Sequence, residues 1–400
     1  MPPHAADLTA ETYRDLARAR RVVGQLEDET LRTQVEVAQI AAPTGDEHRR
    51  ADWVAERFRA LGLRTDRDDA GNVVAHTPGA YAGAPVVVCA HLDTVFPADV
   101  DLVVRRDGSR YVGPGICDNG RGIAVMLTLA RVLPECGGAL ARAVEFVATT
   151  GEEGAGDLRG ARHYLGRADR APFAVIAIDG AGDERIVNTG LGCRRFRVTY
   201  RGPGGHSWSA YGTANPVHAA ARAVAAITAL RVRGAARSTL TVSRIGGGVS
   251  VNTIPEQAWF EVDARSTDGV ALGRMEAEIR AISGAAIVEE NSLRHSGSGG
   301  LTGEVERIGD RPSGGTSADS PLVHAALIAT RLVGRVPELA TASTDANAAM
   351  ALGVPAIAIG GGGRGGDAHS TREWFDATGG TAGMERALTI VATMARIAAD

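Results

Sequence analysis

The chain has 400 residues, of which 44% are hydrophobic and 22% are charged, and its formal net charge is −4. This length allows roughly two or three domains with well-buried cores, and the small net charge gives no reason to expect nucleic acid or an anionic membrane as a partner. All 43 basic residues are arginine, which excludes a Schiff-base lysine or the lysine of a Walker-type P-loop.

Short apolar strands alternate with helical stretches over roughly the first 190 residues. Apolar residues recur three and four positions apart within 11–60, which predicts helices there, and the same pattern predicts helices at 120–133 and 158–166. Continuous apolar runs predict buried strands at 85–90, 143–150 and 173–178. Buried strands separated by helices are typical of an α/β domain with a largely parallel sheet.

The pattern changes near Gly190. The following segments predict a strand, a helix, two strands, a helix and a weak strand, at 193–202, 215–230, 238–248, 257–266, 269–283 and 301–308. This β-α-β-β-α-β order is typical of the ferredoxin-like arrangement. We therefore predict that residues 192–308 form a second domain, inserted into an α/β domain of residues 1–191 and 309–400. A helix at 320–334 and a strand at 354–363 resume the first pattern.

The amino terminus and the cysteines bear on the compartment. Residues 1–29 carry charges throughout and lack the apolar core of a secretory signal, and no apolar run approaches the roughly 20 residues that span a bilayer. The four cysteines show no CxxC spacing, which is typical of thiols in a reducing compartment. We expect a soluble, cytoplasmic protein with no membrane partner.

Polar side chains follow the predicted strands of the first domain. Ligands of an open parallel sheet collect beyond the carboxyl ends of its strands. The chemistry-bearing residues at these positions are His91, Asp93, Glu152, Glu153, Asp179 and His369, and Asp118 lies in a glycine-rich loop before a helix. Each one alone has an ordinary alternative, such as a helix cap for Asp118 or a solvated loop for the glutamate pair. Together they supply enough carboxylates and imidazoles for one or two divalent transition metals, with zinc, manganese and cobalt all suitable.

The two adjacent glutamates need a compensating positive charge, which such cations would supply. Neighbouring side chains of an extended segment point apart, so Glu152 and Glu153 are expected to differ in role. One can bind metal while the other acts as a general base on water. Asp93 lies two residues beyond His91, on the same side of an extended chain, where its carboxylate can bond the ring nitrogen that is not used for metal.

Five segments resemble the cocatalytic dizinc exopeptidases of the aminoacylase, carboxypeptidase G and peptidase T type: "HLDTV", "GPGICDNGRG", "TTGEEGAGDLRG", "IDG" and "DAHSTREW". The segments "TTGEEGAGDLRGARHYL" and "STDANAAMALGVPAIAIGGGG" are most similar in amino-acid sequence to the peptidase T group, the tripeptide aminopeptidases. The resemblance covers nearly the whole chain in order, including the inserted domain.

The resemblance implies two divalent metal ions, most readily zinc, with cobalt or manganese also suited. Asp118 would bridge the ions. His91 and Asp179 would complete one site, and Glu153 and His369 would complete the other.

Further residues take roles by the same resemblance. Glu152 would be the general base, and Asp93 would orient the metal-binding histidine that precedes it. The inserted domain would be a lid that also forms a homodimer. Within it, His206 of "GPGGHSW" would stabilise the oxyanion, and Asn252 and Arg265 would bind substrate. An arginine there can hold a carboxylate with two hydrogen bonds.

The expected activity is hydrolysis of amide bonds in short peptides, with release of the amino-terminal residue. An N-acyl-amino-acid amidohydrolase or a carboxypeptidase on the same scaffold is the alternative. A serine hydrolase is disfavoured because "GHSWS" at 205–209 ends in serine where the G-x-S-x-G elbow needs glycine, and lies away from a strand-to-helix turn. A non-catalytic binding protein is disfavoured because every expected ligand and the base are present.

Overall fold

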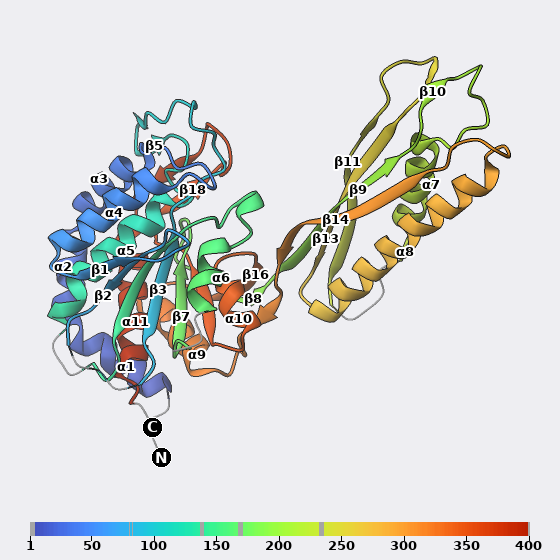
Figure 1. Ribbon diagram of the computed structural model, residues 1–400. Coiled ribbons are helices and arrows are strands. Elements are labelled where there is room, and N and C mark those ends of the chain that lie inside the picture. The colour runs from blue at the N-terminus through green and yellow to red at the C-terminus, as the bar shows by residue number, and fades with distance from the viewer. Residues whose placement is uncertain are drawn as a thin grey trace. The chain divides into compact units, whose positions relative to one another are not determined.

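The computed structural model describes residues 5–79, 81, 83–136, 140–166, 171–231 and 236–398 (Figure 1). The chain divides into two compact units, one of residues 1–190 and 315–400 and the other of residues 191–314. The second unit extends beyond the expected end at 308 because its last strand, β14 (Thr302–Arg311), is longer than the weak strand expected there. Within the described ranges, no helix combines the length and apolar character needed to cross a bilayer.

A nine-stranded sheet forms the centre of the first unit. Its order is β1-β2-β6-β3-β7-β17-β8-β15, with β16 beside β8. The strands are β1 (Arg64–Arg67), β2 (Val73–His76), β3 (Val86–His91), β6 (Val144–Thr149), β7 (Ala174–Ile178), β8 (Arg185–Gly190), β15 (Gly314–Gly315), β16 (Glu338–Ala342) and β17 (Ala356–Ile359). The neighbours β6, β3, β7 and β17 run parallel, whereas β1, β2 and β6 pair antiparallel. The predicted mostly parallel sheet is therefore confirmed, with an antiparallel edge.

Helices cover both faces of this sheet. One face packs against α2 (Ala17–Gln25), α3 (Glu27–Ala38), α4 (His48–Ala60), α5 (Gly120–Val132), α9 (Pro321–Leu332) and α11 (Gly380–Arg396). Helix α1 (Ala5–Asp15) packs on α9 and α11. The other face packs against α6 (Arg159–Leu165) and α10 (Ala346–Ala351). Alternate residues of β3 serve the two faces, since Val88 belongs to the first core and Val87 to the second.

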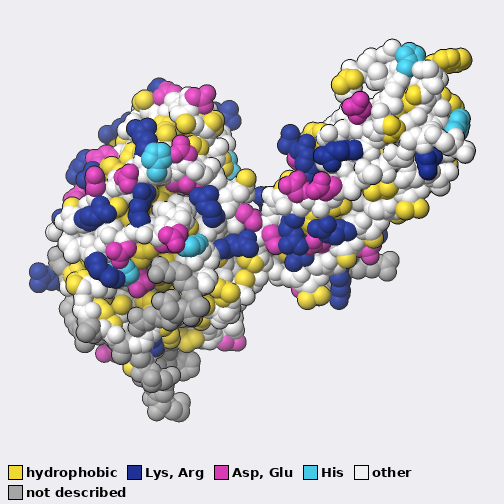
Figure 2. All heavy atoms as spheres, viewed as in Figure 1, with side chains coloured by type: hydrophobic (Ala, Val, Ile, Leu, Met, Phe, Trp, Pro, Cys, Tyr) yellow, Lys and Arg dark blue, Asp and Glu magenta, His cyan; other side chains and the backbone are white. Residues whose placement is uncertain are grey.

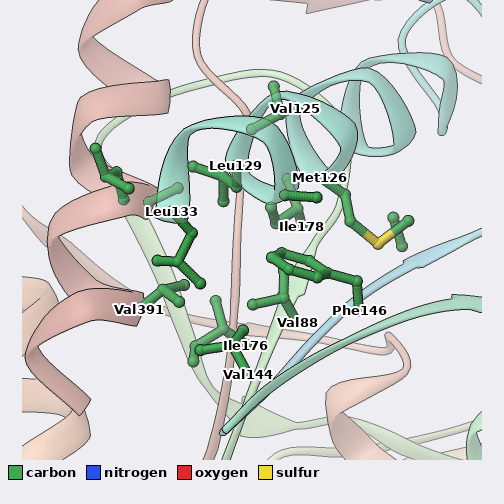
Figure 3. Close-up of a cluster of buried hydrophobic side chains, with 14 of the residues drawn as sticks. Val88, Val125, Met126, Leu129, Leu133, Val144, Phe146, Ile176, Ile178 and Val391 are labelled. Atoms are coloured by element: carbon green, nitrogen blue, oxygen red, sulfur yellow. The ribbon is translucent and has the colours of Figure 1, made fainter. Parts of the chain in front are cut away.

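The larger core lies beneath α5, which continues into a short 3₁₀ helix at Leu133–Glu135. Val125, Met126 and Leu129 of α5 belong to the same core as Val88 of β3 and Phe146 of β6 (Figure 3). This packing holds β3 and β6 in place. The loops that leave the carboxyl ends of these two strands therefore start from rigid positions.

A small antiparallel sheet has the order β18-β19-β5-β4. Its strands are β4 (Arg105–Asp107), β5 (Arg110–Val112), β18 (Arg364–Gly366) and β19 (Trp374–Asp376). Pairing of β19 with β5 brings the chain just after His369 beside the chain just before Asp118.

The second unit is an antiparallel sheet of order β11-β13-β9-β14 with two helices. In chain order its main elements are β9 (Gly192–Arg201), α7 (Pro216–Ala229), β11 (Ser238–Gly247), β13 (Gln257–Ser266), α8 (Gly269–Leu293) and β14. The predicted β-α-β-β-α-β order is therefore present. Helix α8 continues past the expected end at 283 because its buried face continues through Ala286. A short pair, β10 (Gly205–His206) and β12 (Thr253–Ile254), adds to this unit.

The two faces of this second sheet differ. Phe196, Phe260 and their neighbours form a core with α7 and α8. Outside this core the strands carry ion pairs, such as Arg197 with Glu261 and Arg195 with Asp263. Basic and acidic side chains accordingly lie next to one another on the visible surface of this unit (Figure 2).

Candidate metal centre

His91 ends the buried strand β3 and is itself buried. Its Nδ1 atom lies 3.0 Å from the backbone carbonyl oxygen of Asp93. A carbonyl only accepts, so Nδ1 carries a proton and Nε2 is the ring atom available to a metal. Nε2 lies 3.0 Å from Oδ1 of Asp118 and 3.8 Å from Oδ1 of Asp179. The possible metal-binding nitrogen therefore faces two carboxylates.

Asp118 lies between two histidines. Its Oδ1 atom faces His91, and its Oδ2 atom lies 3.1 Å from Nε2 of His369. The alternative role as a helix cap belongs to the next residue, since Oδ1 of Asn119 accepts from the backbone N–H of Gly122 at the start of α5. The carboxylate of Asp118 thus has the position of a bridging ligand.

Glu153 and His369 form the other half of the cluster. Nε2 of His369 lies 2.8 Å from Oε1 of Glu153. Glu153 is buried, whereas 53% of the His369 side chain is exposed. His91, Asp118 and Glu153 each offer a ligand atom within 4.8 Å of the others. With the contacts of Asp179 and His369, the structure brings all five predicted ligands together.

The carboxylate of Asp93 lies beside the His91 ring and also bonds neighbouring backbone N–H groups. The His91 ring bonds the backbone carbonyl of Asp93, and the carboxylate Oδ1 is farther away, at 3.5 Å. In addition, Oδ1 accepts from the backbone N–H of Glu152 and Oδ2 from that of Glu153, each at 2.9 Å. Oδ2 also accepts from the hydroxyl of Thr44 at 2.8 Å. These three donors fix the orientation of the carboxylate beside the ring.

The glutamate pair lies in the loop between β6 and a short 3₁₀ helix, Gly154–Gly156. Both residues are buried. Glu153 has an extended backbone, with φ −78° and ψ 148°. Neighbouring side chains point apart on such a backbone, which supports different roles for Glu152 and Glu153.

The histidines and carboxylates of the cluster shift one another's pKa values. Burial opposes a charge on His91, but hydrogen bonds to Asp118, Asp179 and Asp93 raise its pKa well above the usual value. The pKa of His369 is raised to about 9, first by its hydrogen bond to Asp118. Burial would raise the pKa of Asp118, but the two histidines lower it. A divalent cation would compete with these protons for the same atoms, and the mixed nitrogen and oxygen donors fit zinc, manganese or cobalt.

Glu373 is a buried carboxylate that sequence reasoning did not single out. It accepts from the backbone N–H groups of Gly115, Cys117 and Asp118 at 3.0, 2.7 and 2.7 Å. Burial raises its pKa to about 7, although these N–H groups act in the opposite direction. Glu373 therefore holds the loop that carries Asp118. Its position within "DAHSTREW", four residues after His369, was the available signal.

Arg50 is a second missed residue. Its guanidinium is fully buried and donates to the carbonyl oxygens of Leu92, at 2.8 Å, and Ile40, at 2.6 Å. Leu92 lies between His91 and Asp93 in the chain, so this arginine fixes the backbone that joins these two residues. Nothing in its helical sequence pattern distinguishes Arg50 from a surface arginine.

The predicted oxyanion-stabilising residue, His206, and the predicted substrate-binding residues, Asn252 and Arg265, all lie in the second unit. His206 pairs with Thr253 in the short β10–β12 ladder, and the next backbone N–H, of Ser207, donates to the carbonyl of Asn252. His206 and Asn252 are therefore neighbours. Arg265 is not with them, because it lies near the far end of β13, where its Nε atom donates to Oδ2 of Asp263 at 2.6 Å.

The serine-hydrolase interpretation gains no support from this unit. The segment 205–209 passes from a two-residue strand into turns, and the next helix, α7, begins only at Pro216. A nucleophile elbow needs a direct strand-to-helix turn.

Comparisons with known proteins agree with this geometry. The model of peptidase family M20/M25/M40 matches residues 87–397. A provisionally named LysW-lysine/LysW-ornithine hydrolase of Aeropyrum pernix is 29% identical over 233 residues, which are 58% of this chain and 61% of that protein. This chain thus spans about three fifths of that relative's length.

Two solved structures share the fold over almost the entire chain. Aminopeptidase PepT from Bacillus cereus has a TM-score of 0.74 at 22% identity, and covers 92% of this chain and 99% of its own. A tripeptidase from Staphylococcus aureus has a TM-score of 0.76 at 22% identity, and covers 93% and 99%. At this identity the likeness establishes the fold alone.

Proposed function

The chain belongs to peptidase family M20/M25/M40, whose members are metal-dependent hydrolases, and we propose that it cleaves short peptides and releases the amino-terminal residue. The observation that carries the proposal is the position of the Asp118 carboxylate, with one oxygen facing His91 and the other facing His369. A carboxylate that presents separate oxygens to two imidazoles is suited to bridge two cations.

The proposed cofactor is a pair of divalent cations, most readily zinc. Asp118 would be shared, His91 and Asp179 would hold one cation, and Glu153 and His369 would hold the other. When bound, such a pair polarises the scissile carbonyl and makes a water molecule more acidic.

The proton transfers are assigned to Glu152. In this proposal its carboxylate takes a proton from the attacking water and passes it to the leaving amine. Asp93 supports this role, because its two carboxylate oxygens accept from the backbone N–H groups of Glu152 and Glu153 and so fix the backbone that carries the Glu152 side chain. The roles of His206 in oxyanion stabilisation and of Asn252 and Arg265 in substrate binding stay predictions, as do a homodimer through the inserted unit and a cytoplasmic location.

Release of the amino-terminal residue is the finer part of the proposal. It is supported by the segments that resemble the peptidase T group and is consistent with a fold shared with a tripeptidase. The alternative is an N-acyl-amino-acid amidohydrolase or a carboxypeptidase on the same scaffold.

A panel of free and N-acetylated tripeptides, assayed with the zinc-, manganese- or cobalt-loaded protein, tests the proposal. We expect hydrolysis of free peptides with release of the first residue. Preference for the blocked peptides, or release of the last residue, would overturn the aminopeptidase assignment in favour of the alternative. Inhibition by a serine-directed phosphonate, without inhibition by a chelator, would overturn the metal-dependent mechanism.

A further inference from the structure

Glu47 is a buried carboxylate in the turn before α4, outside the predicted ligand set. Its Oε1 atom accepts from the backbone N–H of Gly45 at 2.8 Å and from that of Gly151 at 3.0 Å. The Nη2 atom of Arg159 lies 3.2 Å from each of its oxygens. Only 5% of the Glu47 side chain is exposed. A carboxylate this buried is stable only with such donors.

With the bond from Gly151, the backbone N–H groups of three consecutive residues donate to carboxylates. Gly151 donates to Glu47, and Glu152 and Glu153 donate to the two oxygens of Asp93. Charge-assisted hydrogen bonds of this kind are stronger than those between neutral groups. The peptide planes on both sides of the Glu152 Cα atom are therefore fixed, and these planes set the direction in which the Glu152 side chain leaves the backbone.

Arg159 holds the same glycine from the other side. Its backbone N–H donates to the carbonyl oxygen of Gly151 at 3.0 Å, and its guanidinium pairs with Glu47. Gly151 has φ +62°, and a Cβ atom there would lie 3.3 Å from the Cβ and Cζ atoms of Arg159. Glu47, Gly151 and Arg159 thus form a closed ring of contacts at the base of the glutamate loop.

The segment around Glu47 also reaches the other loop. Thr44 donates to Oδ2 of Asp93 at 2.8 Å, and the backbone N–H of Thr94 donates to the carbonyl of Ala42 at 2.9 Å. Residues 42–47 therefore connect the loop after β3 with the loop after β6. They precede residue 87, where the family match begins.

We propose that Glu47 is a positioning residue for Glu152. Paired with Arg159, its carboxylate fixes Gly151 and so aims the general base. The inference rests on the proposed function, which makes Glu152 the general base. A displacement of about 1 Å at such a group can lower turnover roughly 100-fold.

The test compares Glu47→Ala, Glu47→Gln and Arg159→Ala with a matched control, Glu290→Ala. Glu290 is an equally buried carboxylate of the second unit that accepts from a backbone N–H, of Asn215, and pairs with Arg222. Two measurements are made on the metal-loaded proteins. One is amide hydrogen exchange of the segment 149–156 by mass spectrometry, and the other is kcat and KM on the best tripeptide, with metal content.

We expect Glu47→Ala to speed exchange of this segment at least about tenfold and to lower kcat roughly 100-fold, with KM within twofold and metal content unchanged. Glu47→Gln keeps an acceptor oxygen and is expected to recover most of the kcat. Glu290→Ala is expected to change neither measurement. Arg159 is partly exposed, so Arg159→Ala tests the same ring if Glu47→Ala does not fold, and we expect about a tenfold loss in kcat.

Two outcomes would overturn the positioning role. One is unchanged exchange in the segment 149–156 when the ring is broken. The other is a kcat within threefold of wild type in Glu47→Ala while Glu152→Gln is inactive, which leaves the proposed function standing. A wild-type protein that cleaves no peptide or acylated amino acid would instead refute the proposed function, and the exchange measurement would still decide whether Glu47 fixes the loop.

Discussion

The backbone N–H of Glu153 donates to Oδ2 of Asp93 across 2.9 Å, so the loop after β3 holds the loop after β6. The same carboxylate holds Glu152 through its other oxygen. The pKa of Asp93 is lowered to about 2, because the bonds from His91 and from these N–H groups outweigh the effect of burial. The carboxylate therefore stays ionised over the working range of pH.

Replacement of Asp93 separates its two possible functions. The His91 ring bonds the backbone carbonyl of residue 93, which Asp93→Asn keeps, whereas one of the two backbone N–H groups would then face an amide –NH₂. We expect metal content near that of wild type and a fall in kcat of about 100-fold, measured by elemental analysis and peptide hydrolysis. Loss of all bound metal from the folded variant would mean instead that the carboxylate acts mainly through His91.

The two glutamates are expected to give opposite results. Glu152→Gln removes the general base and should keep the metal, with kcat lowered by about 10²–10⁴-fold. Glu153→Gln removes a proposed ligand and should lower metal content first. Elemental analysis of both variants, purified side by side, checks the division. Near wild-type turnover in a metal-loaded Glu152→Gln protein would refute its role as base.

The metal-free protein should lose stability as the pH rises from about 6.5 to 9. The pKa of folded His369 is raised to about 9, above its usual value of 6.5. A raised histidine pKa contributes stability that is complete below pH 6.5 and is lost as the pH passes through 9. The melting temperatures of chelator-treated wild type and His369→Gln should therefore converge between these two pH values. A difference that stays constant, or that widens, would contradict the assignment.

The loop that carries Asp118 should depend on Glu373. Glu373→Ala leaves three buried N–H groups without their acceptor, and each such group costs about 1–3 kcal/mol. We expect the free energy of unfolding in urea to fall by at least about 3 kcal/mol. Glu373→Gln keeps one acceptor oxygen and should lose less. A stability equal to wild type in the alanine variant would show that other acceptors replace this carboxylate.

The fold and the metal cluster were largely predictable because both follow from local patterns. Buried apolar runs predicted the parallel strands, and the polar residues after them predicted the cluster. The strand ends place residues as far apart in sequence as His91 and His369 at one edge of the sheet. Helix α11 and the short strands β1, β8 and β16 were not among the predicted elements; β1 and β16 are largely exposed and carry no continuous apolar run.

The supporting carboxylates were not predictable in the same way. Glu47 and Glu373 bond backbone N–H groups of distant loops, and every residue except proline has such a group. Their partners therefore leave no pattern in the sequence. For Asp93, the sequence spacing correctly placed the residue beside His91. The spacing carried no information on the backbone N–H groups of Glu152 and Glu153, which donate hydrogen bonds to the Asp93 carboxylate.

The chain enters and leaves the second unit at adjacent strand ends. Cys193 near the start of β9 pairs with Arg311 at the end of β14, and just outside the unit the N–H of Thr316 donates to the carbonyl of Asn188 at 2.8 Å. The unit is therefore one continuous segment whose two ends lie close together. If a short turn from Gly190 to Gly315 replaced the unit, the strand order of the sheet that carries the ligand cluster would not change. By the same topology, evolution can exchange or enlarge this one uninterrupted segment while the strands that carry the ligand cluster are kept.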